Sequence, residues 1–372
     1  MKSKQKRKIL FVIPSIEAGG AERVLCTVVA ALNKDKYEIG LVLFNEPSAS
    51  ELIAKLNINK IYYLPKRHKL DFFLLICKLI SITSTIKPDV VISSLMYTNI
   101  INVFHSFFLK YSPKIVLWEH NVPINSLRSE NFSFLKKFII SKFYNKADKI
   151  IVVSAEIANE FIKHYQVQPE KITIIYNPID INEICSQINS DSVVMSKVSA
   201  PNLIAVGRLE GAKRFDRLLN IICLAKEKLP RIKLFIAGRG TLEVDLMRLS
   251  KELGIEDNVV FLGFRKDIFS LIASADIFIL TSDYEGFPMV LLEAMVCKTP
   301  IISSNFKGAN ELIKDGENGF LINKDRIDDY VDAIINLTQD PELRNQVITN
   351  ASVGVQRFTT SQLIKDYERL FE

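Results

Sequence analysis

The chain has 372 residues, 48% of them hydrophobic, which is more than one core usually supports and predicts two domains. Its five cysteines are scattered and form no Cys-x-x-Cys pair, which argues against a disulfide framework or a zinc site and favours the reducing cytosol. The net charge of +6 is uneven, because residues 1–180 contain 25 Lys and Arg against 15 Asp and Glu, and the rest of the chain contains 23 against 27.

The N-terminal segment superficially imitates a secretory signal but is interpreted as a strand. A basic start, Met1–Lys8, precedes the apolar run Ile9–Ile13, yet the run breaks at Pro14 and Glu17 without a small-residue cleavage site. The longest later apolar run, Phe72–Ile86, falls short of the roughly 20 apolar residues that a membrane-spanning helix needs. The sequence therefore predicts a cytoplasmic protein without a spanning helix.

Basic and aromatic residues are interleaved in two parts of the first 180 residues. The run Lys66–Lys69 precedes Phe72–Ile76, and the run Phe132–Phe138 leads on to Lys142 and Phe143. Such segments can rest on an anionic membrane surface, which predicts peripheral attachment at its inner face. Solvated helix faces are the alternative interpretation. Nucleic acid is not expected as a partner, because no helix-turn-helix, zinc-finger or RNP motif accompanies the charge.

Apolar strands alternate with helical patterns along the chain, which predicts α/β layers built on parallel sheets. The first strand, Ile9–Pro14, leads to Gly19 and Gly20 and then to a helix over residues 21–32. Adjacent glycines at this junction permit a ligand to approach the backbone closely, although a helix start also favours small residues. The junction lacks Gly-x-Gly-x-x-Gly, so a nicotinamide oxidoreductase is not favoured. Further strands are predicted over Ile39–Phe44, Asp89–Ser93 and Lys114–Trp118.

Two polar residues follow predicted strands at the end where an open α/β sheet exposes its binding crevice. His120 follows the strand Lys114–Trp118, although a lone histidine is more often structural than catalytic. Asn177 follows the strand Ile172–Tyr176 and precedes Pro178, which is also ordinary turn chemistry. Both residues are therefore candidates for a binding site at this edge.

A polar stretch without periodicity separates the two halves of the chain. It covers residues 181–199 and is interpreted as a linker. The expected organisation is an N-terminal domain over residues 1–180, this linker, a C-terminal domain over residues 200–355 and a final helix over residues 356–372.

The second domain opens with the strand Asn202–Val206, which delivers Gly207, Arg208 and, after a short loop, Lys213. The guanidinium fork of Arg208 and the mobile charge of Lys213 can reach one diphosphate. Fixed cations that hold a departing diphosphate more strongly lower the barrier to its departure. No Asp-x-Asp triad occurs, so no metal is expected. The alternative is two surface cations on a loop.

Two carboxylates, Glu285 and Glu293, stand eight residues apart across a strand-to-helix junction. The strand is Ile277–Leu280 and the helical pattern covers Val290–Val296, so backbone N–H groups at the helix start are available to anionic oxygens. Glu293, about one turn further, can accept two hydroxyl protons, as a ribose offers. A first-turn acid and a solvated helix residue are the alternatives for Glu285 and Glu293. The residues predicted to line this junction are Gly286, Phe287, Pro288, Met289 and Val290.

The run from Ser282 to Glu293 resembles the Glu-x7-Glu motif of retaining glycosyltransferases of family 4, and the similarity extends through Gly207-Arg208-Leu209 with Lys213. It covers roughly residues 9–325. The resemblance implies the GT-B fold, in which two Rossmann-like parallel-sheet domains face a central cleft. The N-terminal domain then binds the acceptor, the C-terminal domain binds the nucleotide sugar, and the last helix crosses back to the first domain.

The resemblance also implies roles for individual residues. Glu285 then lies beside the transferred sugar, Glu293 holds the nucleotide ribose, and His120 touches the donor sugar. Gly19 and Gly20 face the donor phosphates or the acceptor, and Asn177 approaches the cleft. The glycine turn Gly238-Arg239-Gly240 is itself compatible with close approach of a nucleotide, and the resemblance implies that the segment containing Arg265 borders the base.

The resemblance implies a retaining hexosyl- or N-acetylhexosaminyltransferase that uses a nucleoside-diphosphate sugar, with UDP as the expected carrier. The acceptor is a hydroxyl of a glycan or lipid-linked glycan, in bacterial-type synthesis of surface polysaccharide, such as lipopolysaccharide or capsule, or of glycoconjugates. No metal or other cofactor is expected. Two alternatives stay open, a GT-B sugar-nucleotide epimerase and a non-catalytic membrane-docking protein on the same scaffold.

Overall fold

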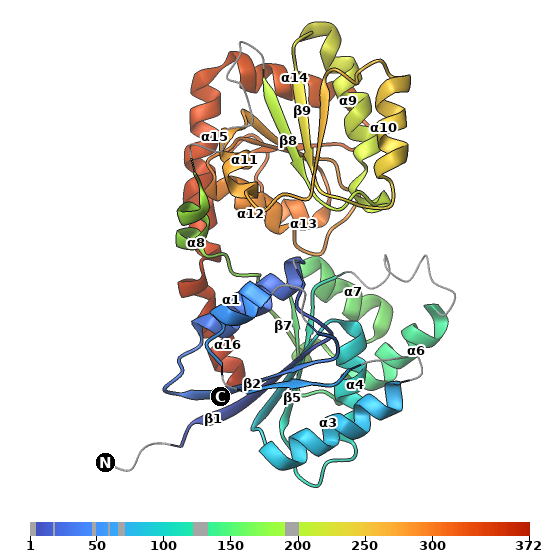
Figure 1. Cartoon of the computed structure of the whole chain (residues 1–372), viewed down its shortest axis with the longest axis vertical. Coiled ribbons are helices and arrows are strands. Elements are labelled where there is room, and N and C mark those ends of the chain that lie inside the picture. Colours follow the sequence, from blue (N-terminus) through green and yellow to red (C-terminus); the bar gives the residue numbers. More distant parts are fainter. Residues whose placement is uncertain are drawn as a thin grey trace. The chain divides into compact units, whose positions relative to one another are not determined.

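The structure, a computed structural model of the chain, describes residues 5–17, 19–46, 50–58, 60–65, 71–121, 133–189 and 201–372. Two compact units result, one containing residues up to Ile179 together with Phe358–Glu372, and the other containing Asp180–Arg357. Each unit has one parallel sheet covered by helices (Figure 1). The predicted α/β fold with two parallel sheets is confirmed. The predicted basic run Lys66–Lys69, the residue Phe132 and residues 190–199 of the predicted linker lie outside the described residues.

The first unit has a seven-stranded parallel sheet in the order β3-β2-β1-β4-β5-β6-β7. Its central strands are continuously apolar because helices cover both faces, as expected of a parallel sheet. The strands are β1 Arg7–Ile13, β2 Tyr37–Leu43, β3 Lys60–Tyr63, β4 Val90–Ser94, β5 Lys114–Glu119, β6 Lys149–Val152 and β7 Ile172–Ile174.

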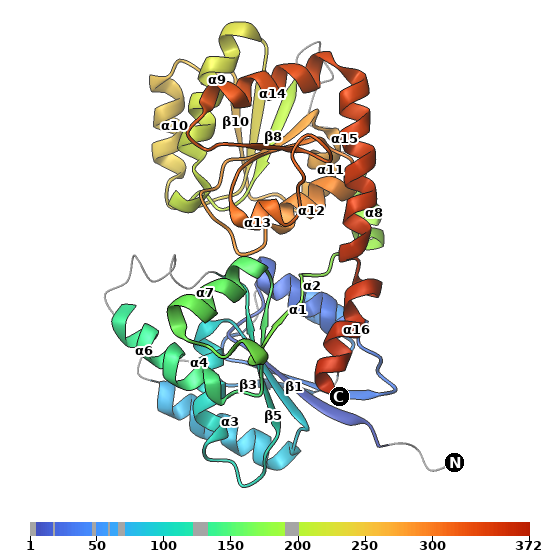
Figure 2. The same cartoon turned by 180° about the vertical axis from the view of Figure 1, so that it is seen from behind.

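Helices α1 and α16 lie on one face of this sheet, and α3, α4, α6 and α7 lie on the other (Figures 1 and 2). The C-terminal helix α16 belongs to this unit, since Phe371 packs on Phe11 and Tyr37, and Tyr367 packs on Trp118. No helix of the described part of the chain combines the length and apolarity needed to cross a bilayer. The helices are α1 Gly20–Ala31, α2 Ser50–Lys55, α3 Phe72–Ile86, α4 Met96–Ser106, α6 Ser133–Phe143, α7 Ala155–Tyr165 and α16 Thr360–Phe371.

The second unit has a six-stranded parallel sheet in the order β10-β9-β8-β11-β12-β13. Helices α9, α10 and α14 pack together over one face, and α8, α11, α12 and α15 pack together over the other. The strands are β8 Asn202–Val206, β9 Lys233–Ala237, β10 Val259–Gly263, β11 Ile277–Leu280, β12 Ile301–Ser304 and β13 Phe320–Ile322. The helices are α8 Ile181–Gln187, α9 Phe215–Lys228, α10 Glu243–Glu252, α11 Ile268–Ser274, α12 Met289–Val296, α13 Lys307–Asn310, α14 Ile327–Gln339 and α15 Pro341–Gly354.

The start of the predicted linker is wrong, because residues 181–187 form helix α8 of the second unit. The Asp180 side chain caps this helix by accepting a hydrogen bond from the Glu183 backbone at 2.9 Å. Ile184 is buried, and the Ser270 hydroxyl of α11 donates to the Gln187 carbonyl at 3.2 Å. One cap and one buried side chain fix this short helix although it has little apolar periodicity.

A buried polar network joins α4 to β5 in the first unit. Glu119 Oε1 accepts hydrogen bonds from the Tyr144 hydroxyl at 2.5 Å and from Asn99 Nδ2 at 2.8 Å. Asn99 Nδ2 also reaches the carbonyl oxygen of Trp118 at 3.1 Å. Burial raises the pKa of Glu119 to about 7, although both hydrogen bonds act in the opposite direction.

A second network joins α9 to the end of β11 in the second unit. Arg217 is 7% exposed and donates to the Thr281 carbonyl and to Asp283 Oδ1, both at 2.7 Å. Arg214 donates to Asp283 Oδ2 at 3.1 Å. Burial opposes the ionisation of Asp283, but the two guanidinium groups outweigh it and hold the pKa of this carboxyl below its usual value.

We expect Glu119 to make the stability of the first unit depend on pH. Its pKa is raised in the folded state from the ordinary value of 4.5, so the stabilisation is complete below pH 4.5 and is lost as the pH rises to about 7. Replacing Glu119 by Gln retains an oxygen that accepts both hydrogen bonds and removes the titration. Relative to Glu119→Gln, the wild type should therefore lose about 3 kcal/mol of stability across this range, because other groups that titrate there, such as His120, contribute to both proteins alike.

Urea unfolding at several pH values, followed by the fluorescence of Trp118, measures this dependence. Trp118 is the single tryptophan of the chain and directly precedes Glu119. If the stability of the wild type and that of the Gln variant change equally between pH 4.5 and 7, Glu119 is not the titrating group.

We expect Asp283→Ala to lower the free energy of unfolding by about 2 kcal/mol, because the buried guanidinium of Arg217 loses its carboxylate partner. The matched control is Asp332→Ala, since Asp332 pairs with Lys228 at 3.4 Å where both side chains are exposed. That exposed pair should contribute less than about 0.5 kcal/mol. Urea unfolding followed by far-UV circular dichroism tests this difference, and equal shifts in both variants would contradict it.

Candidate functional site

The candidate residues of the first unit follow strands at one edge of the sheet. Gly19 and Gly20 follow β1, His120 follows β5, and Asn177 follows β7. Because all seven strands are parallel, their carboxyl ends meet at the same edge. The structure therefore places these predicted residues along that edge.

His120 is held in one orientation within a buried setting. Its Nε2 lies 3.0 Å from the hydroxyl oxygen of Ser94, and its ring packs on Trp118 with centroids 4.8 Å apart. The residue is 6% exposed, and burial lowers the pKa of His120 to about 3. The imidazole is therefore neutral at physiological pH. Its Nδ1 is buried and has no hydrogen-bond partner among the described residues.

The glycine loop and Asn177 have distinct surroundings. Gly19 caps α1 and Gly20 begins it. The Glu22 carboxylate folds back over Gly19, where its Oε2 lies 2.1 Å from the position that a side chain on Gly19 would take. An acidic group thus occupies the start of α1, where the helix dipole favours negative charge. Asn177 is 4% exposed, and its Oδ1 has no hydrogen-bond partner among the residues described.

The second unit brings one predicted cation and one predicted carboxylate into contact. Lys213 Nζ lies 2.7 Å from Glu285 Oε2, and their side chains are 18% and 17% exposed. The Ser282 hydroxyl donates to Glu285 Oε1 at 2.8 Å. Lys213 comes from the loop after β8 and Glu285 from the loop after β11, and these strands are neighbours in the sheet. Their pairing therefore fixes two loops against each other at the carboxyl edge.

Three glycines allow the loops at this edge to approach closely. A side chain on Gly238 would place its Cβ 1.9 Å from the Gly207 carbonyl oxygen, and one on Gly308 would lie 2.6 Å from the Glu285 carbonyl oxygen. A side chain on Gly207 would lie 3.2 Å from Lys213 Cε. Gly207 and Gly238 were predicted from the sequence to belong to the site, and Gly308 was not.

Two other predicted cations have partners outside the Lys213–Glu285 contact. The Arg208 side chain is 80% exposed and pairs with Glu210 at 3.1 Å. Arg265 makes two hydrogen bonds to Asp267, at 2.8 and 2.5 Å. Both arginines follow strands at the carboxyl edge, but the structure does not join either of them to Lys213. The prediction that Arg208 shares a diphosphate with Lys213 stays a prediction.

Helix α12 begins at Met289 with Pro288 as its N-cap, one residue before the predicted helical pattern of Val290–Val296. Gly286, Phe287 and Pro288 are buried and connect β11 to this helix. Val290 and Met289 are half-buried in its first turn. Glu293, one turn further, is 8% exposed, which is unusual for a solvated helix residue. Its burial favours a role in the fold or in ligand binding over a solvent-facing one.

Sequence reasoning missed the two serines that orient the candidate residues. Ser282 holds Glu285, and Ser94 holds His120. Both lie at or just beyond the carboxyl end of a strand, β11 for Ser282 and β4 for Ser94. This position at the carboxyl end of a strand was the sequence feature that could have pointed to the two serines. A small hydroxyl residue is too common at strand ends to be selected on this basis alone.

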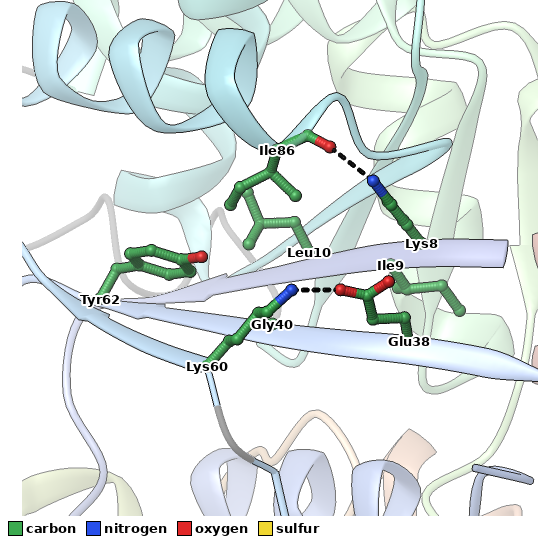
Figure 3. A pocket seen from close by; sticks show the side chains of 8 residues that line it. All are labelled: Lys8, Ile9, Leu10, Glu38, Gly40, Lys60, Tyr62 and Ile86. Carbon is green, nitrogen blue, oxygen red and sulfur yellow. Dashed lines mark hydrogen bonds and ion pairs between the residues drawn. The ribbon is translucent and has the colours of Figure 1, made fainter. Parts of the chain in front are cut away.

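A small hollow in the first unit lies away from these residues (Figure 3). It opens between β1, β2 and β3 because Gly40 has no side chain, and the ring of Tyr62 and the side chain of Leu10 border it. Lys60 pairs with Glu38 across its rim. None of the predicted site residues lines this hollow. Within the described ranges, no group of three or more His, Cys, Asp or Glu side chains is arranged to hold a metal ion.

Two family models match the chain. "Glycosyltransferase Family 4" matches residues 18–183, and "Glycosyl transferases group 1" matches residues 191–353. A relative from Campylobacter jejuni, N-acetylgalactosamine-N,N'-diacetylbacillosaminyl-diphospho-undecaprenol 4-alpha-N-acetylgalactosaminyltransferase, is 29% identical and covers 97% of this chain and 98% of its own. The UDP-Gal:alpha-D-GlcNAc-diphosphoundecaprenol alpha-1,3-galactosyltransferase of Escherichia coli is 25% identical, with 90% of each chain covered.

The fold is also similar to solved structures. HepE of Anabaena, crystallised in complex with UDP, superimposes with a TM-score of 0.82 at 24% identity, covering 97% of this chain and 98% of that one. This similarity supports the GT-B architecture expected from the sequence. The two family matches together cover most of both units, and β1 and α16 lie outside the matched ranges. The chain belongs to the family 4 glycosyltransferases and is a glycosyltransferase with the GT-B fold.

Proposed function

We propose that this enzyme transfers a sugar, with retention of anomeric configuration, from a UDP-sugar to a hydroxyl of a lipid-linked glycan. The transfer serves the synthesis of surface polysaccharide or glycoconjugates at the inner face of the membrane. The names of two relatives support the acceptor class, because both describe transfer to a sugar on diphospho-undecaprenol. The UDP complex of HepE and the UDP-Gal in the name of the E. coli relative support the carrier.

The observation that carries the proposal is the contact between Lys213 and Glu285 at the carboxyl edge of the second sheet. It joins an ammonium, suited to a diphosphate, to a carboxylate suited to a sugar ring that develops positive charge. A donor bound here would place its diphosphate by Lys213 and its sugar by Glu285. Arg208 would need to turn from Glu210 toward the same diphosphate, which its 80% exposure permits.

In the proposed reaction, the bond between the anomeric carbon and the diphosphate oxygen breaks as the acceptor oxygen bonds to that carbon on the same face. The hydroxyl proton of the acceptor passes to the leaving phosphate oxygen. Lys213 stabilises the charge that grows on the diphosphate, and Glu285 stabilises the oxocarbenium-like sugar. Glu285 is not assigned as a base, because its Oε2 already bonds Lys213 and its Oε1 already accepts from Ser282.

His120 and Glu293 complete the proposed assignment. A neutral His120 imidazole, fixed at Nε2 by Ser94, can use its unpartnered Nδ1 in a hydrogen bond with a sugar hydroxyl. Glu293 accepts hydroxyl protons of the nucleotide ribose. Gly19 and Gly20, with the first unit, serve the acceptor or the donor phosphates.

We expect Lys213→Met to reduce kcat/KM by about 10²- to 10³-fold, on the scale of a lost oxyanion donor. The reason is that the departing diphosphate loses a fixed positive charge. Lys228→Met is the control, because Lys228 lies exposed on α9. Steady-state assays with a UDP-sugar panel and a lipid-linked acceptor measure the effect. Unchanged turnover by folded Lys213→Met would remove Lys213 from the diphosphate site.

We expect Glu293→Gln to weaken UDP binding by about 10- to 100-fold, because a hydrogen bond to a charged acceptor is replaced by one to a neutral amide. At saturating donor, kcat should change less. Titration calorimetry with UDP tests this against Glu252→Gln, which alters an exposed residue of α10. Equal UDP affinities for the wild type and Glu293→Gln would exclude the ribose assignment.

A further inference from the structure

Phenylalanine side chains form a continuous strip across three neighbouring helices of the first unit. Phe104 of α4 contacts Phe72 of α3 and Phe143 of α6, with ring centroids 5.8 and 4.7 Å apart. Phe107, just after α4, contacts Phe104 and Phe143, and Phe73 contacts Phe72. Helices α3, α4 and α6 lie on the same face of the sheet (Figures 1 and 2). The strip therefore joins these helices into one surface.

Several apolar side chains within this strip or next to it in sequence are exposed to solvent. Phe73 is 77% exposed, Phe108 64%, Phe107 50% and Leu74 48%. Phe138 of α6 is also exposed, so four of the five exposed phenylalanines of the described residues lie on these three helices or the turn after α4. Exposed aromatic side chains gathered in this way mark an interaction surface.

The charged residues on these helices and in the segments that flank them are all lysines. Residues 72–88, 90–118 and 133–147 contain eight lysines and no Asp, Glu or Arg. Lys110, Lys137, Lys142 and Lys146 are exposed. Four acids are nearest in sequence. Asp89 and Asp148 accept hydrogen bonds from the backbone of Lys8 and Ile115, Glu119 is buried, and Asp71 lies half-buried at the N-cap of α3. A solvated surface usually mixes both signs.

This surface could bind either a folded protein or an anionic lipid bilayer. The absence of arginine from its charged residues helps to decide between these two partners. Protein interfaces are enriched in Arg and depleted in Lys, because Arg makes directed, bidentate bonds. Lysines act as mobile point charges that are attracted to anionic lipid headgroups, and exposed aromatic rings insert between the lipids. The composition of this surface fits a bilayer better than a folded protein.

We propose that the surface formed by Phe73, Leu74, Phe107 and Phe108, with its lysines, docks the enzyme onto an anionic phospholipid bilayer. The biological purpose of this docking rests on the proposed function. Lipid-linked acceptors are confined to a membrane, so an enzyme that uses them must reach its surface. Helix α4 ties the docking surface to the candidate site, because its first turns hold Asn99 on Glu119, next to His120, and its last turn carries Phe104. Docking thus fixes the orientation of that edge of the sheet relative to the lipid.

Co-sedimentation of the full chain with vesicles tests the docking surface. We expect binding to vesicles of phosphatidylglycerol and phosphatidylcholine to be at least about tenfold stronger than to phosphatidylcholine alone, and to weaken with salt. The double variant Phe73→Asn and Phe108→Asn should reduce the binding constant by about tenfold or more. Lys110→Gln with Lys142→Gln should reduce binding to the anionic vesicles only. The matched control is Val244→Asn with Val353→Asn, which changes two side chains of the second unit that are each 70% exposed.

Calorimetric titration of the same proteins with UDP separates this proposal from the proposed function. All variants should keep wild-type UDP affinity, which also shows that the second unit is folded, and unchanged Trp118 fluorescence shows the same for the first. Vesicle binding that is absent, or equal in the wild type and the Phe variant, would overturn the docking surface and leave the transferase assignment intact. Vesicle binding without any UDP affinity would support the surface and refute the proposed donor.

Discussion

The close approach of backbone loops at the carboxyl edge of the second sheet is the constraint on which the candidate site depends. Gly238 lies against the Gly207 carbonyl, and Gly308 lies against the Glu285 carbonyl, at distances that admit no side chain. Because these loops are packed together, Lys213 reaches Glu285 from a different strand. The Arg217–Asp283 pair holds the base of the same loops. Charged groups are useful to catalysis only when they are fixed before the substrate arrives, and buried contacts provide this.

The first unit fixes its candidate residue by a different means. His120 stands between Trp118, on which its ring packs, and Ser94, which meets Nε2. Trp118 in turn packs on Tyr367 of the C-terminal helix, so the last residues of the chain support the setting of His120. The neighbouring Glu119 is neutralised over part of the physiological range by its own burial, which keeps an unpaired charge out of the core. The two units thus hold their site residues by aromatic packing in one case and by ion pairs in the other.

Sequence patterns predicted the central strands well, because a strand buried on both faces is a continuous apolar run with little else to imitate it. The strands β8 and β11 have the bounds that the sequence suggested. The edge strand β3 was missed because its four residues, Lys60–Tyr63, are exposed or half-buried and carry no such run. Helix α8 was taken for linker because a single cap and one buried isoleucine determine it. The motif residues were found because they follow strands at positions where parallel sheets expose a crevice.

By itself, the sequence determined the two parallel sheets, the order of their strands along the chain and the edge at which polar residues would gather, since these follow from apolar periodicity and from the direction of parallel strands. Only the tertiary structure decided which of those residues meet. It joined Lys213 to Glu285, turned Arg208 toward Glu210, set Ser94 on His120 and assembled phenylalanines from three helices into one strip. Contacts of this kind depend on the directions of side chains and on the paths of loops between distant segments. Local sequence patterns specify neither of these.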